Sequence, residues 1–160
     1  MPLSPALRRA CLAARVTCHL AVVVIPVAAL YTIATRGLDP ALALIGIAVL
    51  VPPVTVGLWG LAALARFFEA ARRGGVLTAS ATRDLRRFAL SLLVQAVLTP
   101  IVGAAFSVLD SWANGPGQRT LAIAISSDVI GFAVLAALLL VVASALAEAA
   151  AQAEERKLII

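Results

Sequence analysis

The stretch RFFEAARRGGVLTASATRDLRR, from Arg66 to Arg87, decides how the rest of the chain can be arranged. It contains six of the 13 Lys and Arg residues, namely Arg66, Arg72, Arg73, Arg83, Arg86 and Arg87. On either side lies a run without charged residues, 40–65 before it and 88–109 after it. Each run is long enough to cross the hydrocarbon core of a bilayer, which needs about 20 residues. A basic segment between two such runs predicts which side of a membrane it occupies.

The composition favours a membrane protein over a soluble one. Hydrophobic residues make up 62% of the 160 residues and charged residues 13%, against about 25% charged in an ordinary soluble domain. A single soluble core cannot bury so many apolar side chains, whereas lipid solvates them from outside. We therefore expect one all-α integral membrane domain, a bundle of four transmembrane helices. Its expected parts are spans at 16–35, 41–65, 88–109 and 122–147, a basic loop at 66–87 and a helical tail at 148–160.

Lys and Arg are unevenly divided between the two sides of these spans. The N-terminal segment has three, the loop 66–87 six and the tail two, whereas the two remaining turns contain only Arg36 and Arg119. Because cytoplasmic segments are enriched in Lys and Arg, both termini and the loop are expected in the cytoplasm. The chain is thus predicted to be a multi-pass protein of the bacterial inner membrane, with its arginines against anionic lipid head groups. Membrane orientation and lipid head groups account for the net charge of +5, so direct nucleic-acid binding is not expected.

Proline recurs near the middle of three expected spans, as Pro26, as the pair Pro52 and Pro53, and as Pro100. Each proline removes an amide donor and displaces the carbonyl four residues earlier, which kinks a helix. One interpretation is a midplane cavity lined by freed carbonyls, as in transporters with broken helices. The other is helix packing alone, because membrane helices tolerate proline. Packing is the interpretation that we favour.

Asp128 is the only acidic residue inside an expected span. A charge at the centre of a membrane helix costs about 2.5–3.5 kcal/mol on translocon scales, so such a residue is a candidate proton or cation site. However, Ser126, Ser127 and Asp128 also resemble a helix N-cap. A span at 129–147 would still be long enough to cross the bilayer and would leave Asp128 at the outer surface. Both interpretations stay open, and the interfacial one is favoured.

The remaining polar residues form no recognisable catalytic or metal-binding pattern. His19, the single histidine, is expected near the cytoplasmic end of the first span, far in depth from Asp128. Cys11 and Cys18 share a helix face but are about 10 Å apart along its axis, which exceeds disulfide reach. We therefore predict no catalytic residues, no metal site and no cofactor, and an enzyme is the least favoured class.

Several short motifs carry a resemblance to a known family. They are Leu58–Trp59–Gly60–Leu61, Phe68 before a glycine, Val76–Leu77–Thr78 followed by Leu85–Arg86, and the tail Glu154–Glu155–Arg156–Lys157–Leu158–Ile159–Ile160. Over roughly its last two thirds the chain resembles a bacterial family of four-span membrane proteins, domain of unknown function 2975. Its tail departs from the Glu-Asn or Glu-Asp-Leu-Thr ending of that family.

This resemblance implies an inner-membrane protein of unknown activity, with no family catalytic residues to transfer. Some relatives are encoded beside a small helix-turn-helix regulator, which would imply a membrane partner in regulation.

Nearly all polar sequence falls on the expected cytoplasmic side, in the loop 66–87 and the segment 148–157. We therefore expect a non-enzymatic interaction or regulatory membrane protein, with a cytoplasmic protein partner or a membrane protein complex. Small residues four apart, such as Gly103 and Ser107, allow close helix approach and a homo-oligomer. The alternative is a small transporter or channel subunit that uses the proline-kinked midplane and Asp128.

Overall fold

The computed structural model of the chain describes residues 5–36, 39–73, 78–113 and 127–157, and α-helix is the only regular secondary structure among them. The helices are α1 (Pro5–Ala34), α2 (Pro40–Arg72), α3 (Ala79–Ala113) and α4 (Ser127–Lys157). Each is long and apolar enough to cross a membrane. The expectation of four such helices is therefore confirmed. The first part of the fourth expected span, 122–126, lies outside the described residues.

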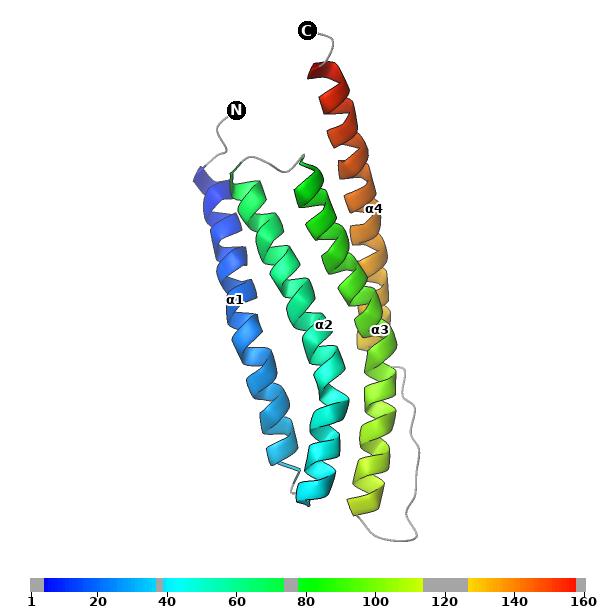
Figure 1. Ribbon diagram of the computed structural model, residues 1–160. Coiled ribbons are helices and arrows are strands. Elements are labelled where there is room, and N and C mark those ends of the chain that lie inside the picture. Colours follow the sequence, from blue (N-terminus) through cyan, green and yellow to red (C-terminus); the bar gives the residue numbers. More distant parts are fainter. Residues whose placement is uncertain (1–4, 37–38, 74–77, 114–126, 158–160) are drawn as a thin grey trace.

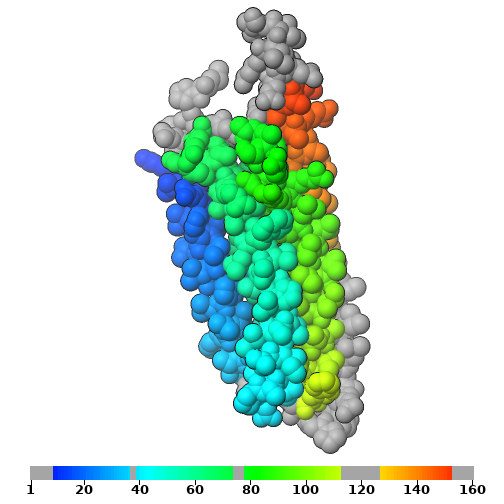
Figure 2. Space-filling view, in the orientation of Figure 1, coloured from blue at the N-terminus to red at the C-terminus, as the bar shows by residue number. Residues whose placement is uncertain are grey.

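The described parts of the four helices form an open row in which each helix packs only against its neighbours in sequence. Within the described residues α1 packs against α2, α2 against α3 and α3 against α4. Consecutive helices are antiparallel, and α1 and α4 form the two ends of the row without touching (Figure 1). Figure 2 shows α1, α2 and α3 side by side on one face of the molecule. The bundle expected from the sequence is thus open where α1 and α4 would otherwise meet.

α2 and α3 approach each other closely because small residues face one another. Gly60 lies against Ser91, and a β-carbon added at Gly60 would come within 2.6 Å of Ser91 Cβ. Ala63 of α2 and Ala89 of α3 have no exposed surface. In lipid there is little hydrophobic driving force between helices, so small residues that bring backbones together supply much of the attraction. This contact between α2 and α3 lies in the middle of the row.

The helix ends follow local sequence signals in part. α3 runs without a break from the basic segment into the third apolar run, so residues 79–87 of the expected loop are helical. Thr78 caps its start, because Thr78 Oγ1 accepts a hydrogen bond from the Ala81 amide at 3.4 Å. Asp39 occupies the N-cap position of α2 but makes no side-chain capping bond. Gly74 and Gly75, a residue type that often ends a helix, lie outside the described residues.

All four mid-span prolines lie inside continuous helices. These are Pro26 in α1, Pro52 and Pro53 in α2, and Pro100 in α3. A side chain of the neighbouring helix reaches this region, because Gln95 Nε2 donates a hydrogen bond to the Pro53 carbonyl at 2.6 Å. That carbonyl is not one of those displaced by the prolines, which belong to residues 22, 48, 49 and 96. The hydrogen bond therefore joins α2 to α3 and serves helix packing.

Candidate interaction surface at the basic end

One end of the row collects most of the charge, and we refer to it as the basic end. It comprises the N-terminal parts of α1 and α3 and the C-terminal parts of α2 and α4 (Figure 1). Two carboxylates, Glu69 of α2 and Asp84 of α3, lie among its arginines. The arginine side chains described there are Arg9, Arg15, Arg66, Arg72, Arg73, Arg83, Arg86 and Arg87.

Glu69 binds three arginines and joins α1 to α2. Its Oε2 lies 2.7 Å from Arg15 Nη1 across the helix contact. Within α2, Glu69 Oε1 lies 2.9 Å from Arg72 Nη2 and 2.8 Å from Arg73 Nη2. Only 18% of the Glu69 side chain is exposed, and hydrogen bonds between ionised groups are the stronger kind. This cluster holds the basic ends of α1 and α2 together.

Asp84 makes the corresponding contacts between α2 and α3, at longer distances. Its Oδ1 lies 3.4 Å from Arg66 Nε and 3.5 Å from Arg87 Nη1. Exposed ion pairs of this kind contribute roughly 0–1 kcal/mol. Together, Glu69 and Asp84 engage four of the six arginines that the sequence assigned to lipid head groups. Those four are Arg66, Arg72, Arg73 and Arg87.

Arg83 and Arg86 differ from those four. Both side chains are exposed, and among the described side chains neither forms an ion pair with a carboxylate. They line a groove of about 640 Å³ between the start of α3 and the C-terminal part of α4. The other lining residues are Ala79, Thr82, Leu140, Ala143, Ser144 and Ala147. The basic segment therefore divides into arginines paired within the chain and two arginines at a groove.

The same groove gives the register of α3 against α4. Ala79, the first residue of α3, and Ala147 of α4 both line it. The residues of α4 after Ala147, 148–157, therefore extend past the start of α3 by about 15 Å at 1.5 Å per residue. Figure 1 shows this end of α4 projecting beyond the other three helices. The helical continuation predicted for the tail is confirmed as far as Lys157.

Among the described residues, the opposite end of the row holds one arginine, which is bound to α3. Arg36 Nη1 donates to both carboxylate oxygens of Asp110, at 2.7 and 2.6 Å. Its guanidinium carbon also lies 4.6 Å from the centre of the Phe106 ring, within the range of a cation–π contact. The charge of Arg36 is therefore balanced locally. Arg119, the other arginine expected on this side, lies outside the described residues.

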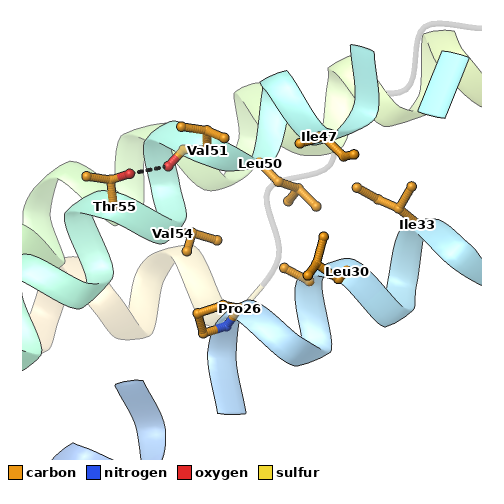
Figure 3. A pocket seen from close by; sticks show the side chains of 9 residues that line it. Pro26, Leu30, Ile33, Ile47, Leu50, Val51, Val54 and Thr55 are labelled. Atoms are coloured by element: carbon orange, nitrogen blue, oxygen red, sulfur yellow. Dashed lines mark hydrogen bonds between the residues drawn. The ribbon is translucent and has the colours of Figure 1, made fainter. Parts of the chain in front are cut away.

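An apolar groove between α1 and α2 contains the first of the mid-span prolines. Pro26 and Leu30 of α1 line it opposite Val51 and Val54 of α2, and its volume is about 210 Å³ (Figure 3). Its one hydroxyl side chain, on Thr55, donates to the Val51 carbonyl of its own helix at 2.7 Å. The described lining thus offers apolar surface and no polar side chain directed to a ligand. It does not form the carbonyl-lined cavity of the transporter interpretation.

Asp128 lies beside the middle of α3. Arg86 and Leu140 line the same groove and so mark one level on α3 and α4. Asp128 precedes Leu140 by about 18 Å along α4, and Pro100 follows Arg86 by about 21 Å along α3. Its side chain is exposed in the first turn of α4. The interfacial interpretation would instead place Asp128 beside the C-terminal end of α3. Asp128 and the Pro26 groove stand at opposite ends of the row.

The histidine and the cysteines form no joint site. His19 is exposed, and its Nδ1 lies 2.8 Å from the Arg15 carbonyl of its own helix. Cys11 and Cys18 are free thiols. A search of the described residues found no group of three or more His, Cys, Asp or Glu residues placed to hold a metal ion.

Comparisons of the chain with models of known protein families, with curated proteins and with solved structures found no match. The resemblance to domain of unknown function 2975 therefore stays a prediction. The function has to be inferred from the geometry of the chain itself.

Proposed function

We propose that the chain is a multi-pass protein of the bacterial inner membrane that acts by binding a cytoplasmic protein partner and catalyses no reaction. The observation that carries this proposal is the projecting end of α4. It extends past the start of α3, and within the described residues α4 packs against no helix other than α3. A helix of alanine and glutamate is stable in water. This one has no packing role in the described fold, which suits a binding element.

The exposed surface of the row supports membrane insertion. Large apolar side chains are exposed along the helices, for example Val23 at 63%, Leu44 at 70% and Val141 at 67%. Lipid is the solvent in which such a surface is stable. The positive-inside rule puts the basic end in the cytoplasm, with both termini on the same side. The segment 66–87 and the projecting end of α4 would then face one compartment.

The proposed partner surface combines opposite charges. The arginines of the basic end attract anionic groups, including lipid head groups. The tail sequence adds a mixed segment of Glu148, Glu154, Glu155, Arg156 and Lys157. Complementary charge gives an interface its specificity and its association rate. A regulatory role that holds a partner at the membrane needs only such a surface. The open ends of the row leave room for a membrane complex or a second copy of the chain.

Photo-crosslinking in cells of the native source tests this function. A photoreactive amino acid is placed at Ala149 or Gln152, both exposed in the tail, and at exposed Val141 of α4 as the matched control. We expect a protein captured from the two tail positions but not from Val141. A tagged copy of that protein should capture this chain in return. The same proteins captured at all three positions, or none at any, would overturn the proposal.

A transporter or channel subunit is the second candidate, and one observation favours it. Asp128 lies level with Pro100, so in a membrane-inserted row it would stand near mid-depth, where ionisable residues mark proton or ion pathways. Because the Pro26 groove is at the other end of the row, one chain does not assemble both features around a single path. A second copy or another subunit would have to complete it.

Flux measurements in proteoliposomes test the second candidate. The purified chain should then carry a proton- or cation-dependent flux that Asp128→Asn abolishes. Glu148→Gln, an exposed carboxylate on the same helix at the basic end, is the matched control and should leave the flux unchanged. Wild-type flux at the level of empty liposomes would remove this candidate.

A further inference from the structure

We propose that the groove between α3 and α4 at the basic end binds one anionic phospholipid, with its phosphate held by Arg83 and Arg86. This site includes two arginines of the basic end and is distinct from the projecting end of α4, which carries the proposed function. It rests on that function only in requiring that the row lies in a membrane.

The first argument is the state of the two arginines. The other arginines of the segment 66–87 are engaged by Glu69 or Asp84, whereas Arg83 and Arg86 contact no carboxylate among the described side chains. A guanidinium binds phosphate through two parallel hydrogen bonds. Two guanidinium groups one helical turn apart can therefore grip one phosphate. Basic pockets between membrane helices on the cytoplasmic side are a known type of lipid site.

The second argument is the apolar strip that continues from Arg86 along α3. Leu90, Leu93 and Val97 follow Arg86 at helical spacing and so share its face. They are 39%, 43% and 59% exposed. Val97 lies about 16 Å from Arg86 along the axis, which is close to half of the ~30 Å hydrocarbon core. A charged group followed by an apolar strip one leaflet long matches the form of a phospholipid.

The third argument is the space at the arginines. Ala143, Ser144 and Ala147 form the α4 wall, and their small side chains leave a groove of about 640 Å³. This is within the usual 300–1,000 Å³, roughly, of small-ligand sites. Ala143 is 4% exposed, so the packing of α4 on α3 builds the wall. A soluble phosphate or a phosphopeptide would use the arginines but not the strip below them, so we assign the groove to a lipid.

Native mass spectrometry of the full chain tests the assignment. The protein is purified in mild detergent and offered phosphatidylglycerol and phosphatidylcholine with identical acyl chains, in equal amounts. Each arginine near an anionic group is worth about fivefold in binding. Wild-type protein should therefore retain phosphatidylglycerol over phosphatidylcholine by about tenfold or more. Replacing both arginines, as R83Q/R86Q, should bring the two lipids within about twofold of each other, since the choline lipid carries no net charge.

Two matched controls separate the site from general charge and from folding. R72Q/R73Q removes the same two charges from arginines that are paired with Glu69, and should keep the preference within about twofold of wild type. Ser144→Leu fills the groove and leaves every arginine in place, so it should also abolish the preference. Ala145→Leu is exposed on the same helix but does not line the groove, and should behave as wild type.

Three results would overturn the lipid site. The first is equal retention of both lipids by wild type. The second is a loss of lipid preference in R72Q/R73Q as large as that in R83Q/R86Q. The third is full displacement of phosphatidylglycerol by an equal concentration of soluble glycerol 3-phosphate. A change of oligomeric mass in Ser144→Leu without any lipid preference in wild type would assign the groove to a second copy instead. Recovery of the chain in a fraction that needs no detergent would contradict membrane insertion, and with it the proposed function. A loss of lipid preference in an inserted protein contradicts this inference alone.

Discussion

α3 packs against a helix on each side, and the two contacts are built from different interactions. Toward α2, Ser91 fits against Gly60, where no larger side chain has room. Gln95 donates a hydrogen bond to an α2 carbonyl, and Asp84 lies within ion-pair distance of Arg66.

Toward α4, the contact consists of small apolar residues. Ala136 and Ala143 of α4 are 0% and 4% exposed, and among the described side chains no hydrogen bond or ion pair crosses from α3 to α4. At the basic end, the groove that Arg83 and Arg86 line lies between the two helices.

The two contacts indicate which helix pair is firmly packed and which pair can accommodate a ligand. Because apolar burial gives little attraction between helices in lipid, close packing and polar contacts decide which helix pairs are firm. The α2–α3 pair has both kinds of contact, whereas α4 has packing alone. α4 is also the helix that projects at the basic end. The parts proposed to bind lipid and protein therefore lie on the side of α3 with fewer specific contacts.

The largest effect is expected at Gly60. Gly60→Leu should lower the free energy of unfolding by about 3 kcal/mol, because the new side chain collides with Ser91 and overpacking costs about 1–3 kcal/mol. Gly131→Leu on α4 is the control, since a β-carbon there meets nothing within 4 Å. Unfolding by detergent titration, followed by circular dichroism, measures both. A similar loss in the two variants would show that the α2–α3 contact is no tighter than the free face of α4.

A smaller effect is expected at Gln95. Gln95→Met keeps the length of the side chain but removes its hydrogen bond to the Pro53 carbonyl. Hydrogen bonds between membrane helices are worth about 0.6 kcal/mol and up to about 1.7 kcal/mol, so the loss should fall in that range. Thr99→Val is the matched control, because the Thr99 hydroxyl bonds only the Gln95 carbonyl of its own helix. If Thr99→Val destabilised the protein as much as Gln95→Met, the loss of the hydrogen bond between α2 and α3 would not explain the effect of Gln95→Met.

The smallest effect is expected at the Arg66–Asp84 pair. The distance is 3.4 Å and the Arg66 side chain is 52% exposed, so a double-mutant cycle with Arg66→Gln and Asp84→Asn should give a coupling of about 0.5 kcal/mol. Raising the salt concentration to about 1 M should remove most of it, because exposed charges are screened over about 3 Å under these conditions. A coupling above about 2 kcal/mol that resists salt would contradict the assignment of this pair as an exposed ion pair.

Much of the helical layout could be predicted from the sequence, because local signals carry it. Long uncharged runs and the arginine segment between them gave four helices, and Thr78, a residue type common at helix N-caps, caps α3. The contacts of Glu69 with Arg72 and Arg73 follow from i, i+3 and i, i+4 spacing. That signal was present in the sequence and was not used in predicting the site.

The candidate site could be predicted only in outline. The basic segment itself was identified, but its division into paired and unpaired arginines depends on which helix lies beside which. Asp128 shows the same limit: as an N-cap residue it fits the outer surface, and only the register of α4 against α3 puts it level with Pro100.

Four long apolar helices with most of the arginines at one end follow from the sequence alone, because hydrophobic length and charge position are properties of single segments. The tertiary structure alone decided that the helices stand in an open row, that Gly60 meets Ser91, and that Arg83 and Arg86 share a groove with α4. These depend on the rotation and register of one helix against another. Between apolar helices, the rotation and register are set by how the small side chains of two helices fit together. The sequence of one helix alone does not define this fit.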